Sequence, residues 1–215
     1  MNHTPKIVAL VAFVAAASLS SQGALAAPAE PMAMAAQSTK ACELQTAMRK
    51  LWEDHITYTR NYIISALGGL GDADAVAQRL MKNQEDIGDA IVPYYGRKAG
   101  TQLTTLLKAH IAIAADVVKA AKSGDKKELA QQQAKWSANG EQIADFLASA
   151  NPNWRRAELA RMLQRHLDLT SGEVVGRLSG DWAADIRSYD EGHQHMLHFA
   201  DVLSEGIEKQ FPRQF

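Results

Sequence analysis

Three histidines recur at nearly equal intervals along the chain, and each falls on the apolar stripe of a predicted helix. They are His55, His110 and His166. Intervals of this size are typical of stacked copies of one supersecondary unit. A pair of antiparallel helices fits within such an interval, so the spacing predicts three helical hairpins with a polar position at the same height in each.

Apolar residues step by three or four through six segments of the chain, as expected for amphipathic helices. Glycine, proline, aspartate and asparagine separate the segments, and these residues are typical of helix ends and starts. The predicted fold class is therefore all-α: an antiparallel bundle of three helical hairpins, six helices, with an internal repeat of about 56 residues. The predicted turns lie at residues 68–72, 93–96, 123–125, 151–152 and 179–181.

Residues 1–26 have the features of a secretory signal peptide. Lys6 precedes an apolar run from Ile7 to Leu19, and the Ala24-Leu25-Ala26 sequence supplies a small-x-small cleavage site. The apolar run is too short to span a membrane, so we expect cleavage, a periplasmic or secreted protein, and no stable membrane anchor afterwards. Residues 27–40 are predicted to be a flexible lead-in, and residues 41–215 a single all-α domain.

Charge and cysteine content exclude several classes of protein. The net charge is −1, and the basic residues are scattered rather than gathered on one face, so we expect no nucleic-acid partner. Cys42 is the only cysteine, which excludes an internal disulfide and covalent haem attachment through a Cys-x-x-Cys-His motif. No Gly-x-Ser-x-Gly nucleophile motif and no glycine-rich phosphate loop is present.

The second helix of each predicted hairpin also carries a polar residue at the repeat interval. These residues are Asn83, Asn139 and His195. Their positions and those of the three repeating histidines lie roughly 20 Å from the hairpin turns, at a rise of about 1.5 Å per residue. The sequence therefore predicts a layer of histidine and asparagine side chains half-way up the bundle.

Transition-metal binding is the leading hypothesis for this layer. Histidine is the commonest nitrogen ligand, and imidazoles from separate helices can converge on a zinc or copper ion. We therefore expect a non-catalytic binding protein, with metal ligands drawn from the layer histidines and with neighbouring polar residues in support. The expected ligands are His55, His110, His166 and His195, and the supporting residues are Asn83, Asn139, His193 and His198.

Three alternatives stay open. The layer can be structural, each histidine pairing with the asparagine of its own hairpin to fix helix register in a structural or protein-partner-binding bundle. A non-covalent haem with methionine as a second ligand is a further possibility. An enzyme that uses the layer for acid–base chemistry is the least favoured, because it needs an open cleft and a perturbed titratable group. The oligomeric state and the identity of any metal are left open.

Two further groups of residues carry simple packing expectations. The carboxylates of Asp168 and Glu173 flank the third histidine and are expected to be solvated, as helix-surface carboxylates usually are. The tryptophans fall at stripe or turn positions, and we expect all of them to pack against other side chains. They are Trp52, Trp136, Trp154 and Trp182.

Short motifs across residues 44–213 resemble those of an uncharacterised family of bacterial all-helical proteins, some of which are named acetylglutamate kinase or glycosyltransferase. The resemblance implies the same helical-hairpin fold, and it implies no activity, ligand or catalytic residue. Both of those named activities use α/β scaffolds, which this sequence does not predict. The motifs are Leu51-Trp52 with His55, Thr59-Arg60, Asn83-Gln84 with Asp86-Ile87, residues 93–96, His110-Ile111, Trp136 with Asn139, Asn151-Pro152, residues 166–170, residues 180–186, and Gln210-Phe211-Pro212.

Overall fold

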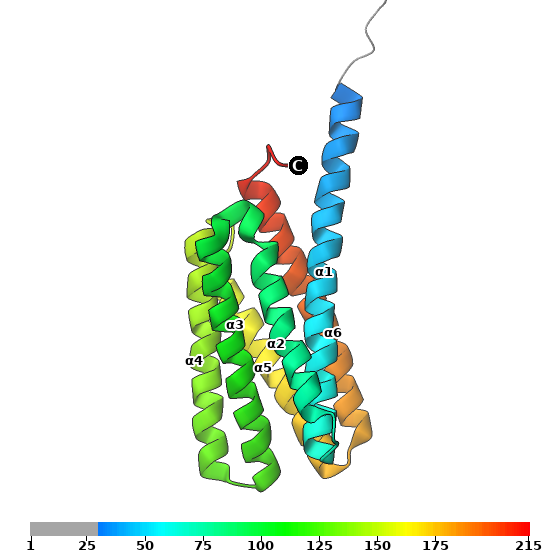
Figure 1. Ribbon diagram of the computed structural model, residues 1–215, viewed down its shortest axis with the longest axis vertical. Helices are drawn as coiled ribbons and strands as arrows, with labels where there is room; N and C mark the ends of the chain where they lie inside the picture. The colour runs from blue at the N-terminus through cyan, green and yellow to red at the C-terminus, as the bar shows by residue number, and fades with distance from the viewer. Residues whose placement is uncertain (1–29) are drawn as a thin grey trace, which may run out of the picture.

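The computed structural model describes residues 30–215, which form six helices and no strand (Figure 1). The predicted signal peptide, residues 1–26, lies outside the described residues. None of the helices in the described part of the chain is long and apolar enough to cross a membrane. The helices are α1 (Glu30–Gly68), α2 (Ala73–Ala90), α3 (Val92–Ser123), α4 (Lys126–Ala150), α5 (Arg156–Ser179) and α6 (Trp182–Gln210).

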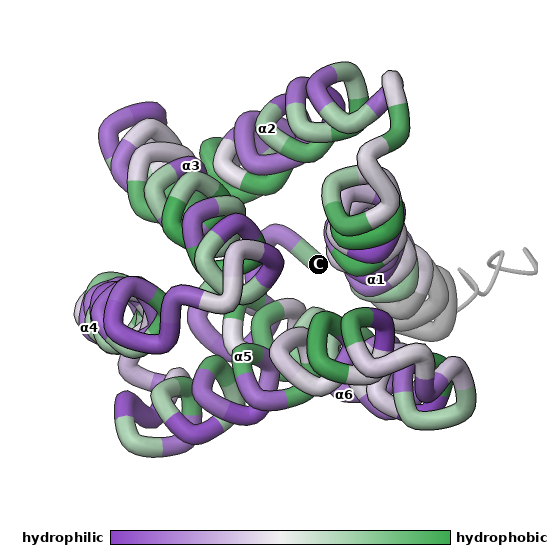
Figure 2. Tube along the Cα trace, turned by 90° about the horizontal axis from the view of Figure 1, so that it is seen from below, coloured by the Kyte–Doolittle hydropathy of each residue, from purple (hydrophilic) through white to green (hydrophobic). Residues whose placement is uncertain are grey.

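The six helices form one closed ring. Each helix packs against its neighbours in sequence, and α6 returns to pack against α1. Helices α1, α3 and α5 also contact one another, which places them nearest the common axis (Figure 2). The all-α prediction of a bundle of three hairpins is therefore confirmed, and the residues at matching heights on α1, α3 and α5 meet at the centre.

The two Ser-Gly-Asp turns show how the sequence sets the helix boundaries. Gly124 and Gly180 end α3 and α5 in the left-handed conformation, with φ of 73° and 72°, which glycine adopts without steric cost. The following aspartates begin the next helices: Asp125 Oδ1 accepts hydrogen bonds from two backbone N–H groups, at 3.0 Å each, and Asp181 Oδ1 accepts one at 2.9 Å.

Two boundaries differ from the sequence-based expectation. Helix α1 begins at Glu30, inside the segment 27–40 that was expected to be a flexible lead-in. Proline in a first helical turn replaces an N–H that has no helical partner, so Pro31 is compatible with this start. The turn predicted at 93–96 lies where α2 gives way to α3, but it is partly helical: α2 ends at Ala90, Pro93 lies in the first turn of α3, and Gly96 interrupts α3 with a φ of 79°.

Apolar side chains pack on both sides of the histidine positions. The largest cluster contains Trp52, Leu107 and Leu163, which precede the histidines on α1, α3 and α5. Ile63, Val118 and Val174, each eight residues after a histidine, form a smaller cluster on the other side. The histidine layer therefore lies between two apolar regions and is shielded from solvent.

Three of the four tryptophans pack in the core as expected, and Trp182 does not. Trp52, Trp136 and Trp154 are each 3% exposed, whereas Trp182 is 57% exposed. Trp182 is the first residue of α6, at the end of the bundle. The guanidinium of Arg177 lies 5.4 Å from the centre of its ring, so a cation–π contact replaces burial.

Candidate functional site

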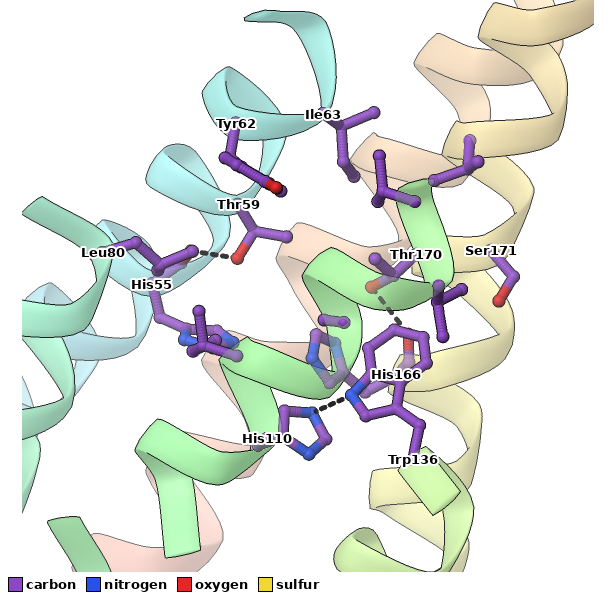
Figure 3. Close-up of a pocket in the computed structure, with 15 residues that line it drawn as sticks. His55, Thr59, Tyr62, Ile63, Leu80, His110, Trp136, His166, Thr170 and Ser171 are labelled. Carbon is purple, nitrogen blue, oxygen red and sulfur yellow. Dashed lines mark hydrogen bonds between the residues drawn. The ribbon is translucent and has the colours of Figure 1, made fainter. Parts of the chain in front are cut away.

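Three imidazoles from three different helices meet at the centre of the bundle. His55 on α1, His110 on α3 and His166 on α5 are 2%, 3% and 3% exposed. The ring centroid of His166 lies 5.5 Å from that of His55 and 6.0 Å from that of His110 (Figure 3). The structure thus brings together three of the four residues that the sequence analysis named as metal ligands.

The polar residues on the second helices hold the layer in place through one recurring hydrogen bond. In each hairpin, a nitrogen of the second-helix residue donates to the backbone carbonyl four residues before the layer histidine. These bonds run from Asn83 Nδ2 to Leu51 O (3.0 Å), from Asn139 Nδ2 to Leu106 O (3.2 Å) and from His195 Nε2 to Met162 O (2.8 Å). Because each bond joins the two helices of one hairpin, the set fixes their relative height.

Both nitrogens of His110 are committed to protein partners. Trp136 Nε1 donates to His110 Nε2 at 3.0 Å, and because indole only donates, Nε2 carries the lone pair. His110 Nδ1 therefore carries the proton and donates it to Asn139 Oδ1 at 2.7 Å. Burial lowers the pKa of His110 to about 4, so the ring is neutral near pH 7.

His55 and His166 are far less constrained by hydrogen bonds. The Gln84 amide nitrogen lies 3.3 Å from His55 Nδ1, and His55 Nε2 has no hydrogen bond within residues 30–215. The His166 side chain forms no hydrogen bond in this part of the chain, and its Nδ1 is buried without a partner. A buried imidazole nitrogen without a partner costs about 1–3 kcal/mol, so this arrangement needs an explanation.

The sequence at the matching positions explains why these two rings lack the partner that His110 has. The position of Trp136 in the second hairpin corresponds to Leu80 in the first and to Gly192 in the third, at the same interval along the chain. Neither leucine nor glycine has a side chain that can donate to an imidazole. His55 and His166 therefore keep an uncommitted ring nitrogen at the point where His110 is bound by an indole.

Burial keeps these two rings neutral as well. Desolvation, with repulsion from His110, lowers the pKa of His55 to about 3. Desolvation, followed by repulsion from the neighbouring histidines, lowers the pKa of His166 well below 6.5. The neutral ring is the form that binds a metal ion, so near pH 7 neither imidazole has to lose an extra proton before an ion can bind.

A small cavity adjoins the three rings. Its volume is about 20 Å³, enough for one water molecule or one ion and far too small for a haem. Its walls are mostly apolar and come from α1, α3 and α5, with Leu80 and Trp136 from α2 and α4. The hydroxyls of Thr59 and Thr170 line it too, and both donate to carbonyls of their own helices, at 2.7 and 2.9 Å. The imidazoles are therefore its nitrogen donors, and the side chains of Tyr62 and Ser171 bring two further hydroxyls to its lining.

The remaining histidines of the predicted site lie apart from this cavity. His195 uses Nε2 to bind the Met162 carbonyl, His193 Nε2 lies 3.3 Å from a carboxylate oxygen of Glu53, and His198 is exposed. Over residues 30–215, no group of three or more His, Cys, Asp or Glu side chains has donor atoms placed to hold a metal ion. Both nitrogens of His110 are turned to Trp136 and Asn139.

A buried charge cluster near the layer was missed by the sequence analysis. Glu173, which was expected to be solvated, is 3% exposed. Arg60 Nη1 lies 3.0 Å from Glu173 Oε2 and 2.8 Å from Asp185 Oδ1, and Arg177 Nη1 lies 2.9 Å from Asp185 Oδ2. Burial raises the pKa of Glu173 to about 7 despite the neighbouring Arg60. Glu173 follows His166 by seven residues and so shares its helix face, which was the available signal.

A scan of protein-family models, a search of curated proteins and a search of solved structures each found no match to this chain. The chemistry of the site is therefore the basis for a functional assignment.

Proposed function

We propose that this protein is a non-catalytic metal-binding protein of the periplasm or the extracellular space, which holds a zinc or copper ion between His55 and His166. The observation that carries the proposal is the pair of buried imidazoles on α1 and α5, 5.5 Å apart, each with an uncommitted nitrogen beside a cavity of about 20 Å³.

The separation of the two rings suits a shared ion. A zinc–nitrogen bond is about 2.0 Å long, so two imidazoles on one tetrahedral ion have centroids about 5 Å apart. The observed centroid separation of 5.5 Å is close to this value. Neutral nitrogen donors suit zinc and copper, whereas calcium and magnesium prefer oxygen ligands.

Gln84 contacts His55 and would rearrange when His55 binds a metal ion through Nε2. Its Oε1 atom is buried without a partner, while its amide nitrogen lies near His55 Nδ1. For Nε2 to bind metal, Nδ1 must carry the proton, so the amide has to turn Oε1 towards Nδ1 and give up the hydrogen bonds that its nitrogen donates to Leu80 O (2.8 Å) and Asn83 Oδ1 (3.1 Å). The hydrogen bond between His110 Nδ1 and Asn139 Oδ1 already has this form, which is common around metal-bound histidine.

A structural role for the layer is the second candidate, and His110 favours it. This ring is fully hydrogen-bonded by protein groups alone, and the recurring bonds to Leu51, Leu106 and Met162 fix hairpin register. Satisfied buried polar groups specify one arrangement of helices without any further function. In that case, His55 and His166 are also core residues and bind nothing.

Calorimetric titration of the metal-stripped protein with zinc and with copper separates the two. We expect a single ion per chain, and an affinity loss of about 100-fold for His55→Ala and for His166→Ala, since each removes one of two protein ligands. Exposed His198 provides the matched control, and His198→Ala should bind as the unmodified protein does. Trp136→Phe should bind at least as tightly, because it frees His110 Nε2. If the unmodified protein binds zinc and copper no more tightly than His166→Ala does, the metal site is refuted and the structural role of the layer remains.

A further inference from the structure

The histidine cavity adjoins a surface groove between α1 and α3. The groove is lined by residues of these two helices only, including the small side chains of Ala66 and Ala115. Tyr62 and Val118 line both the groove and the cavity. These two side chains therefore form the wall that separates the imidazoles from the groove.

The residues that line the cavity are not equally buried. Tyr62, Ala114 and Ser171 are half-buried, whereas the other residues that line the cavity are buried. Of these three, Tyr62 is the one that also lines the groove between α1 and α3. Tyr62 is therefore the half-buried part of the wall that faces this groove.

Tyr62 is free to move without breaking a hydrogen bond. Its ring lies on the same side of α1 as Thr59 and His55, beside the layer (Figure 3). Its hydroxyl has no hydrogen bond to any residue in the 30–215 range. Burial, together with the carboxylates of Asp116 and Asp74, raises the pKa of this phenol, so it is neutral near pH 7. By contrast, Lys122 at the groove is tied to α1 by a 2.7 Å hydrogen bond to the Ala66 carbonyl.

We propose that the groove between α1 and α3 is the access route to the histidine cavity, and that the Tyr62 side chain is the gate that closes it. The identity of the ligand that passes through, a zinc or copper ion, rests on the proposed function. The position of the gate does not, because it follows from the wall of the cavity itself.

Chemical modification of the histidines tests the gate without any metal. Diethyl pyrocarbonate reacts with neutral imidazole, and mass spectrometry of peptides gives a rate for each histidine. We expect Tyr62→Ala to raise the rates at His55 and His166 about tenfold, since local opening controls access to buried groups. Tyr62→Phe keeps the ring and should react as the unmodified protein does. Ala115→Leu fills the groove and should slow both rates.

His110 provides the internal control, because both of its nitrogens are hydrogen-bonded. A rise at His55 and His166 with little change at His110 supports the gate. No rise in Tyr62→Ala, or an equal rise at all three histidines, overturns it, since the latter indicates general opening of the bundle. If Tyr62→Ala does not fold, Ala115→Leu decides: unchanged rates overturn the route. The two proposals can fail separately. If the modification rates do not respond to Tyr62→Ala but zinc or copper still binds, the gate is wrong and the metal site stands. If the rates respond but no metal binds, the metal site is wrong and the access route stands.

Discussion

Acid should destabilise this fold through its histidine layer, and His110 makes the effect measurable. The native pKa of His110 is about 4, against 6.5 for an exposed histidine. Below pH 6.5 the unfolded chain binds a proton at this residue and the native protein does not. The stabilisation is therefore complete above pH 6.5 and is lost as the pH falls towards 4.

The magnitude follows from the same pKa difference. Each pH unit in this window removes about 1.4 kcal/mol per buried histidine from the free energy of unfolding. Between pH 6.5 and pH 5 the loss is about 2 kcal/mol for His110 and about the same for His55, whose pKa is about 3. His166 acts in the same direction. Small domains have a total stability of about 5–15 kcal/mol, so this loss is a large share.

Urea unfolding of the protein and of His110→Gln, at several pH values from 6.5 to 5, measures the contribution of His110 to the pH dependence of stability. The variant should be less stable throughout, but its stability should fall less steeply with acid, by about 1.4 kcal/mol per pH unit. Contributions from groups that do not interact with His110 cancel in this difference. Leu107→Ala is the matched control, since it removes buried apolar contacts and no titratable group. If the free energy of unfolding falls equally steeply with pH in the protein and in His110→Gln, His110 is not a buried neutral imidazole.

Three other substitutions test the core around the layer. As the pH rises from 5 to 8, Glu173→Gln should gain about 2 kcal/mol of stability relative to the unmodified protein. The native pKa of Glu173 is about 7, so its ionisation at high pH favours the unfolded chain. A stability difference in urea unfolding that stays constant with pH would contradict this. Gly176→Ala should destabilise by about 1–3 kcal/mol, because a Cβ there would lie 2.6 Å from the backbone nitrogen of Asp185. Gly140→Ala, whose Cβ would meet nothing closer than 3.8 Å, should instead raise the melting temperature, since alanine favours helix.

The helices and their pairing were predictable because the signals are local. Helical periodicity, the two Ser-Gly-Asp turns and near-equal hairpin lengths are properties of neighbouring residues. Equal hairpins place matching residues at matching heights, which is why the spacing of His55, His110 and His166 anticipated that they meet. The closed ring was not predictable, because it depends on α6 packing against α1 from the far end of the chain.

The hydrogen bonding within the layer was only partly predictable. Pairing of a histidine with the asparagine of its own hairpin occurs at His110 and Asn139, but His55 lies near Gln84 instead. Side-chain rotamers decide such partners, and periodicity does not determine them. The burial of Glu173 was likewise missed, because its partner Arg60 lies far away in sequence, on α1.

Nitrogen-15 NMR of the histidine-labelled protein, before and after one equivalent of zinc, tests the central claim most directly. Before zinc, the spectrum should show His110 as the neutral tautomer protonated at Nδ1. On addition of zinc, the ring signals of His55 and His166 should shift to metal-bound values while His110 keeps its tautomer. Unchanged signals from all three rings, or shifts confined to His193 and His198, would contradict a metal site between α1 and α5.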